Sequence, residues 1–143
     1  VHRLLEWLTQ PGAAADAEAW APAAAEVFGL PASLAGEVAR RAAAVLRGPG
    51  ARFFGTGLRW AGNEVELADA AGALRIDRLV CIDTADGPQW WVLDYKLALA
   101  PGEVQAYRAQ LARYRAAVRA LHPGRSVRAA FVAGDGALVE LDD

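Results

Sequence analysis

The chain has 143 residues, of which 55% are hydrophobic and 22% charged, and its formal net charge is −2 at pH 7. These values are typical of a globular domain with its own core, and no apolar run approaches the roughly 20 residues of a membrane-spanning helix. The acidic balance argues against a protein that holds nucleic acid by net positive charge alone, although an acidic metal site would carry negative charge that bound cations offset.

Cys81 is the only cysteine, so the chain can form neither a disulfide framework nor a cysteine-ligated zinc or iron–sulfur site. Its apolar neighbours predict a packed, inert thiol, and we expect a reducing, cytoplasmic location. No basic segment followed by an apolar one indicates a signal peptide. The chain lacks methionine and opens within a helical pattern, so we expect a domain excised from a longer protein.

The first 50 residues carry the spacing of helices. Apolar residues in 1–8 recur at helical intervals, and Asp16–Phe28 predicts a second helix with Asp16 as its cap. A third helix is predicted to start at Ser33 as its N-cap and to end before a glycine-proline-glycine segment. The sequence therefore predicts a helical segment over 1–50.

Beyond this segment the apolar residues alternate with polar ones, which is the period of a β-strand. Three strands are predicted, joined by two short polar turns: Leu58–Ala68, Leu74–Ile82 and Gln89–Lys96. Short turns between consecutive strands favour an antiparallel meander.

The remaining chain reads as a helix over Glu103–Leu121 and two strands, Ser126–Ala133 and Ala137–Leu141. Helices, a meander, a helix and two strands together predict an α/β fold with a mixed β-sheet of about five strands flanked by helices. We expect a single domain over 1–143, with its α/β core over 51–143.

Two carboxylates and a lysine fall near the ends of neighbouring predicted strands. Asp94 and Lys96 are two positions apart, so they project to the same face, and a hairpin would place Asp77 beside Asp94. Buried charges are costly unless they are paired or ligate a metal, which makes a divalent cation with oxygen ligands the sharper hypothesis. An ordinary surface ion pair between Asp94 and Lys96 is the alternative.

Three segments around these residues resemble the motifs of a known family: Ile76–Leu79, Leu93–Lys96 and Gln110–Tyr114. They resemble the PD-(D/E)XK nuclease superfamily, and look most like the RecB-type domain at the C-terminus of bacterial helicase–nucleases such as RecB and AddA. His2 matches the leading histidine of that family, and Glu64 falls where the family has a glutamate one strand before the first aspartate. The resemblance covers nearly the whole chain.

The resemblance implies a restriction-endonuclease-like core and a metal-dependent DNA nuclease, expected to be an exonuclease in DNA end processing and recombinational repair. It implies Mg²⁺ or Mn²⁺ as the cofactor, held by His2, Asp77, Asp94 and the backbone carbonyl of Tyr95. A nitrogen ligand suits Mn²⁺ better than Mg²⁺. Relatives of the AddB and Cas4 type carry an iron–sulfur cluster, which this chain cannot ligate.

The same resemblance implies roles for the remaining motif residues. Lys96 would orient or activate the attacking water and stabilise charge on the phosphate, and Glu64 would reach a second metal or its water shell. Gln110 and Tyr114, one helical turn apart, would position the water or the DNA backbone. Leu97 stands where relatives often have threonine or serine, so one phosphate-contacting hydroxyl is missing.

The partners implied are DNA, contacted through its backbone without base-specific readout, and a UvrD-like helicase motor in the same polypeptide or complex; no membrane is expected. Five arginines near the motifs are candidates for phosphate contacts: Arg75, Arg78, Arg108, Arg113 and Arg115. For the last three of these, a solvated helix face is an equal alternative.

Other interpretations stay open. The chain could be a catalytically degenerate nuclease-fold module for DNA-end binding or helicase docking, or a domain that mainly docks to its motor. A small-molecule metallohydrolase would usually show a histidine-rich ligand set, which is missing here. The glycine-rich segments lack the lysine and hydroxyl residue of a P-loop, so no nucleotide site is predicted.

Overall fold

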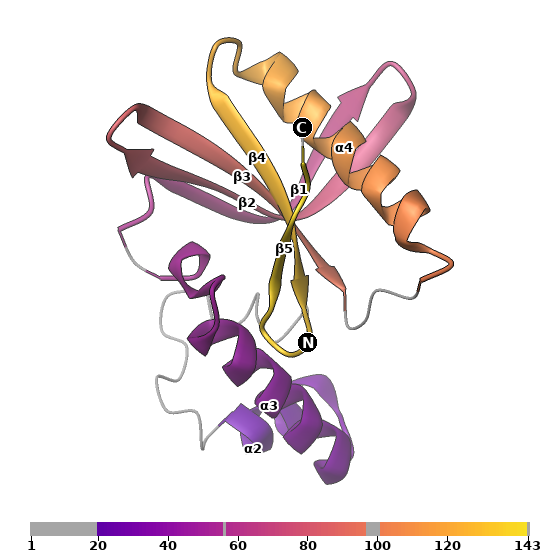
Figure 1. The fold of residues 1–143 in the computed structure, drawn as a ribbon. Coiled ribbons are helices and arrows are strands. Elements are labelled where there is room, and N and C mark those ends of the chain that lie inside the picture. The colour runs from indigo at the N-terminus through magenta and orange to yellow at the C-terminus, as the bar shows by residue number, and fades with distance from the viewer. Residues whose placement is uncertain (1–19, 56, 97–100, 143) are drawn as a thin grey trace. The chain divides into compact units, whose positions relative to one another are not determined.

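The computed structural model describes residues 20–55, 57–96 and 101–142 (Figure 1). The chain divides into two compact units. The helical unit comprises Val1–Gly55 and Gly134–Ala137, and the sheet unit comprises Thr56–Ala133 and Leu138–Asp143. The predicted metal ligand His2 lies outside the described residues.

The helical unit contains α2 (Trp20–Phe28), α3 (Ala32–Arg47) and the short 3₁₀ helix η2 (Ala51–Phe53), and α2 packs against α3. The prediction that Ser33 caps α3 is wrong. The helix already begins at Ala32, because the Ala35 amide donates to the carbonyl oxygen of Pro31 at 2.9 Å. No helix in the described part of the chain combines the length and apolar character needed to cross a bilayer.

The sheet unit is built on five strands in the order β1-β2-β3-β4-β5. Their bounds are β1 (Trp60–Asp69), β2 (Gly72–Thr84), β3 (Gly87–Lys96), β4 (Ser126–Ala133) and β5 (Leu138–Glu140). The first three strands form the predicted antiparallel meander, β4 runs parallel to β3, and β5 returns antiparallel to β4. The predicted mixed α/β architecture is therefore confirmed at this level.

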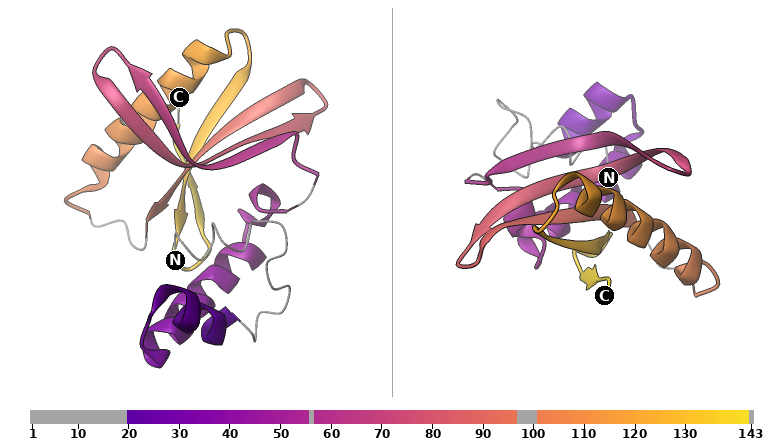
Figure 2. Two further views of the ribbon diagram at one scale, coloured as in Figure 1. Left: turned by 180° about the vertical axis from the view of Figure 1, so that it is seen from behind. Right: turned by 90° about the horizontal axis from the view of Figure 1, so that it is seen from above.

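Helix α4 (Val104–Leu121) connects β3 to β4 and lies across one face of a strongly twisted sheet, against β1, β3 and β4 (Figures 1 and 2). Its inward residues follow helical spacing and are led by Leu111 and Val118, which are fully buried. They pack on Val92 and Phe131 of the central strands. This packing holds the first turns of α4 near the C-terminal ends of β3 and β4.

Strand β2 presents one set of alternate side chains to α4 before Asp77 and the other set after it. Ile76 and Leu79 both join the core under α4, although residues three apart on a regular strand point to opposite faces. Opposite this point on β1, Glu64 has a positive φ of 48° and leaves the ladder unpaired between Asn63 and Val65. Asp77 therefore lies at an interruption of the sheet rather than within a regular ladder.

Candidate active site

The hairpin of β2 and β3 brings the two predicted carboxylates together. The ladder ends with the pair Arg78 and Leu93, so the next position along places Asp77 opposite Asp94. Beyond that pair, the Tyr95 amide donates to Asp77 Oδ2 at 2.8 Å rather than to a backbone carbonyl of β2. The aspartate side chain thus takes over a hydrogen bond of the sheet, which fixes its carboxylate beside Asp94.

Asp94 and Lys96 form a mostly buried ion pair, not the surface pair that the alternative interpretation requires. Lys96 Nζ lies 3.0 Å from Asp94 Oδ2, and Asp94 is only 6% exposed. The contact is close but not aligned as a hydrogen bond, and Asp94 Oδ2 has no hydrogen-bond partner among the described residues. A buried carboxylate oxygen without a hydrogen bond calls for an explanation, and a bound ion or water is one.

The neighbours of Asp94 change its acidity. Burial raises the pKa of Asp94 to about 6, and the hydrogen bond and negative charge of Asp77 act in the same direction, while Lys96 opposes them. Burial alone would lower the pKa of Lys96, but its contact with Asp94 and the charge of Asp77 outweigh burial and raise it. The lysine is therefore held as an ammonium beside two carboxylates that repel each other.

Lys96 is the only lysine of the chain, which also contains fourteen arginines. Arginine spreads its charge over a planar fork, whereas lysine carries a compact charge on a flexible stem. This single lysine stands where it faces the carboxylates of Asp94 and Asp77. The uniqueness of this lysine is visible in the amino-acid sequence alone.

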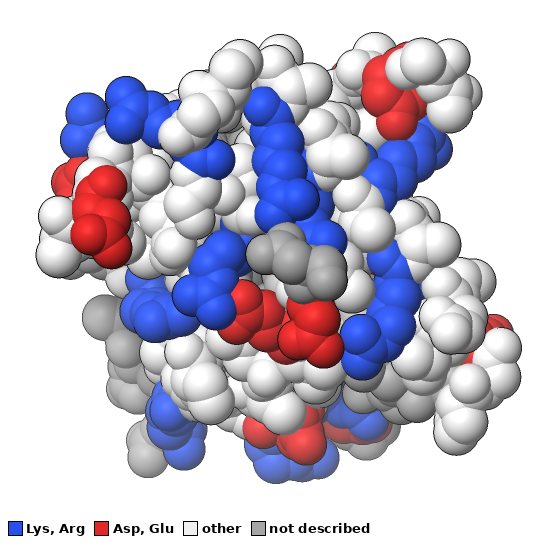
Figure 3. All heavy atoms as spheres, turned by 45° about the horizontal axis from the view of Figure 1, so that its top comes forward, with Lys and Arg blue, Asp and Glu red and all other residues white. Residues whose placement is uncertain are grey.

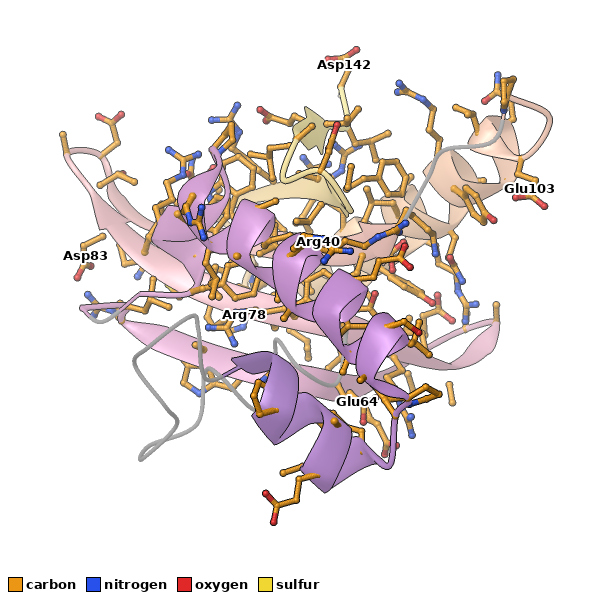
Figure 4. All side chains as sticks on the ribbon, turned by 90° about the horizontal axis from the view of Figure 1, so that it is seen from below. Arg40, Glu64, Arg78, Asp83, Glu103 and Asp142 are labelled. Carbon is orange, nitrogen blue, oxygen red and sulfur yellow. The ribbon has the colours of Figure 1, made fainter. Side chains whose placement is uncertain are left out.

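The motifs did not point to Tyr107 and Glu103, which also belong to the site. The Tyr107 ring lies over the Lys96 ammonium, 4.6 Å from Nζ to its centroid, and its hydroxyl donates to Glu103 Oε2 at 2.6 Å. Figure 4 shows Glu103 at the start of α4. The signal that could have found Tyr107 is its spacing from Tyr114, two helical turns along the same face.

Tyr114 joins the site, and Gln110 does not. Tyr114 is buried at 9% exposure, and its pKa is raised first by burial and then by the negative charges of Asp94 and Asp77. Tyr114 is therefore within electrostatic range of both carboxylates. Gln110 is exposed one turn earlier, and no contact between its amide and these carboxylates is present in the described residues.

Glu64 lies on the strand next to Asp77, but its side chain points elsewhere. It is half-exposed, with its carboxylate 3.9 Å from the Arg75 guanidinium, and it is labelled in Figure 4. The positive φ of Glu64 turns its side chain out of the regular strand direction. The described geometry therefore gives Glu64 an ion pair with Arg75 rather than a place beside the two aspartates.

Three of the five candidate phosphate-binding arginines have structural contacts instead. Arg78 is buried and donates to Asn63 Oδ1 at 2.8 Å. Arg113 donates to both carboxylate oxygens of Asp69 at 2.7 Å, which ties α4 to the turn between β1 and β2. Arg115 is buried and donates to main-chain carbonyls near the end of the described chain. Sequence proximity to the motifs did not distinguish these roles.

The residues present fit a divalent cation, although they form only part of a ligand set. Asp77 and Asp94 offer adjacent carboxylates, and the buried Asp94 Oδ2 lacks a hydrogen bond. Magnesium is commonly bound by one or two carboxylates together with water and substrate phosphates. No group of three or more His, Cys, Asp or Glu side chains gathers within the described ranges, and the predicted ligand His2 lies outside them.

The contact between Tyr107 and Lys96 predicts the reactivity of the single lysine. Replacing Tyr107 with leucine should speed the modification of Lys96 by an amine-specific reagent about two- to fivefold, because the ring no longer covers and stabilises the ammonium. Tyr107→Phe keeps the ring and should react like the unaltered protein. Peptide mapping by mass spectrometry separates Lys96 from the terminal amine. Equal rates for the leucine and phenylalanine variants would contradict this contact.

Comparison with models of known protein families and with curated proteins gave no match to this chain.

Proposed function

We propose that this chain is a metal-dependent DNA nuclease domain that hydrolyses phosphodiester bonds. The observation that carries the proposal is the meeting of Asp77, Asp94 and Lys96 at the end of the β2–β3 hairpin, in a mostly buried cluster. Two adjacent carboxylates with one unsatisfied oxygen suit a divalent cation, and the neighbouring ammonium suits the developing charge of a phosphate.

Each residue of the site would have its own role in hydrolysis. Asp77 and Asp94 would hold Mg²⁺ or Mn²⁺, which supplies Lewis acidity and a lowered pKa of water when bound. Lys96 would orient the attacking water and stabilise negative charge on the phosphate oxygens. Tyr107 and Asp94 fix the position of the Lys96 ammonium from two sides, so little reorganisation is needed when the phosphate arrives.

The finer parts of the proposal depend on the motif resemblance. A restriction-endonuclease-like core is compatible with the five-stranded mixed sheet and its covering helix. An exonuclease of the RecB type, working in DNA end processing beside a UvrD-like helicase motor, is the activity that the motifs favour. His2 would be a further metal ligand and the Tyr95 carbonyl another.

The direct test is DNA degradation by this chain on linear single- and double-stranded substrates, in Mg²⁺, in Mn²⁺ and in a chelator. We expect cleavage in at least one metal and none in the chelator, with backbone rather than base preference. Asp135→Asn is the matched control, because it removes an equally charged carboxylate at an exposed turn position that lines neither hollow of the sheet unit. A folded protein that cleaves neither substrate in either metal would overturn the proposal.

A catalytically inactive domain of the same fold, used for DNA-end binding or helicase docking, is the second candidate. One observation favours it: the described residues bring together two acidic ligands but not a third. Calorimetric titration with Mn²⁺ distinguishes the two. The nuclease requires binding that Asp77→Asn and Asp94→Asn each weaken, whereas the inactive domain would bind DNA without this metal dependence.

A further inference from the structure

Apart from the active site, the sheet unit contains a hollow where β4 begins and β5 ends. Its cavity volume is about 550 Å³. Charged side chains dominate its described lining: Arg115, Arg119, Arg125, Arg128, Glu140 and Asp142. The arginines outnumber the carboxylates by four to two. Figure 3 shows such blue side chains gathered around red ones on one face of the molecule.

Main-chain carbonyls and an aromatic ring hold several of these arginines in place. Arg115 donates to the carbonyls of Leu141 and Asp142 at 3.2–3.3 Å, and Arg119 donates to the Val127 carbonyl at 3.2 Å. Arg128 pairs with Glu140, and its guanidinium lies 4.8 Å from the centroid of the buried Trp91 ring. Carbonyl acceptors fix a guanidinium without removing its charge.

Arg125 extends this lining into a neighbouring hollow. It is exposed and, with Gln89 and Ser126, lines both the large hollow and a smaller one of about 140 Å³ beside the turn between β2 and β3. Gln89 and Ser126 are themselves hydrogen-bonded at 3.2 Å. The two hollows therefore share a wall that offers a guanidinium, an amide and a hydroxyl.

We propose that this arginine-lined hollow binds the phosphodiester backbone of the DNA strand on which the active site works. The inference rests on the proposed nuclease function for the identity of its ligand. Guanidinium groups bind phosphate through paired N–H donors, and backbone contacts by arginine, amide and hydroxyl side chains position nucleic acid without reading its sequence. The lining offers these three donor types.

The hollow and the active site lie at different ends of β3. Gln89 lines the hollow, and Asp94 is five residues further along the strand, which corresponds to about 17 Å at roughly 3.3 Å per residue. Figure 4 shows Asp83, before the β2–β3 turn, and Glu103, at the start of α4, at opposite sides of the view. At about 3.4 Å per nucleotide, the rise of stacked duplex DNA, about five nucleotides span this distance.

The test measures DNA binding in a chelator, so it does not depend on cleavage. Arg119→Gln with Arg125→Gln should weaken binding of a strand of about 20 nucleotides at least tenfold. The same change should lower the slope of log affinity against log salt by about 1.4–1.8, as expected for two lost phosphate contacts. Arg125→Gln alone should lower the slope by about half as much. Because Arg125 is exposed, this single variant is expected to fold, and it shows whether weak binding by the double variant comes from misfolding.

Arg41→Gln with Arg59→Gln is the matched control, since each arginine pairs with an acidic side chain and neither lines the hollow. The control should bind like the unaltered protein. Unchanged affinity and salt slope in the hollow variants would overturn the inference. So would tighter capture of an acidic peptide than of DNA.

Failure of this inference is separable from failure of the nuclease proposal. Cleavage by the unaltered chain, together with full DNA binding by the hollow variants, overturns the inference and leaves the nuclease intact. Weakened binding in the hollow variants supports the phosphate site even where no protein cleaves DNA.

Discussion

Replacing Lys96 with alanine is expected to lower the rate of metal-dependent DNA cleavage about 100- to 10,000-fold, the usual range for a group that activates water or stabilises a developing charge. The Lys96 ammonium lies 3.0 Å from Asp94 Oδ2, and Lys96 is the only lysine of the chain. Lys96→Arg should also lose most of the activity, because a planar guanidinium that cannot be deprotonated does not reproduce a compact ammonium.

The measurement is the initial rate on labelled linear DNA, with each variant purified in the same way so that a contaminating nuclease would appear in all preparations. Arg59→Ala is the matched control, because Arg59 also pairs with an aspartate of the same sheet, Asp83, at 2.8 Å. It should retain full activity. Near-normal cleavage by folded Lys96→Ala protein would show that the chemistry lies elsewhere.

The central hairpin and its two aspartates could be predicted because local rules and the global fold agree there. Alternating apolar residues placed β2 and β3, and the polar turn between them required an antiparallel pair. The alternation of side chains along the two paired strands then gave their register, which places Asp77 beside Asp94. The strands predicted for β2 and β3 were shorter than the observed ones, because alternation marks only the half-buried part, whereas hydrogen bonding continues to the turns.

The positions of Glu64 and Gln110 could not be predicted from spacing. A positive φ is expected of glycine or asparagine, and Asn63 stands next to the residue that adopts it, yet Glu64 takes this conformation. Gln110 is one turn from Tyr114, but the core beneath α4 follows Leu111, Tyr114 and Val118, which leaves Gln110 on the exposed side. Helical spacing identifies neighbours, and only packing decides which neighbour is buried.

The arginines show a similar limit. Arg113 pairs with Asp69, forty-four positions away along the chain. Arg119 and Arg125 lie outside every motif, yet they line the arginine-rich hollow of the sheet unit. Contacts of this kind arise from the crossing of α4 over the sheet, which periodicity predicts only as a fold class.

Replacing Asp94 with asparagine is expected to stabilise the metal-free protein at pH 8 by up to about 3 kcal/mol. The folded state raises the pKa of Asp94 to about 6, roughly two units above its ordinary value, and each unit corresponds to about 1.4 kcal/mol. Burial and the negative charge of Asp77 together disfavour the ionised form. Asparagine has about the same shape and carries no charge.

The sign of the pH dependence follows from the raised pKa. Between about pH 4 and 6 the folded state binds more protons at Asp94 than the unfolded state, so the contribution of Asp94 to the stability falls as pH rises through this window. The difference between Asp94→Asn and the unaltered protein should therefore be small at pH 4 and full above pH 7. Asp86→Asn, at an exposed turn, is the matched control and should change the stability little.

Adding Mn²⁺ should reverse the order of stability at pH 8. A cation that binds only the folded state stabilises it in proportion to the logarithm of its concentration over its dissociation constant, and Asp94→Asn removes one of the two carboxylates that would hold it. Urea unfolding with and without the metal measures both effects. A variant that is less stable than the unaltered protein in the absence of metal would show that the Lys96 pair outweighs burial, and that Asp94 serves the fold rather than a metal site.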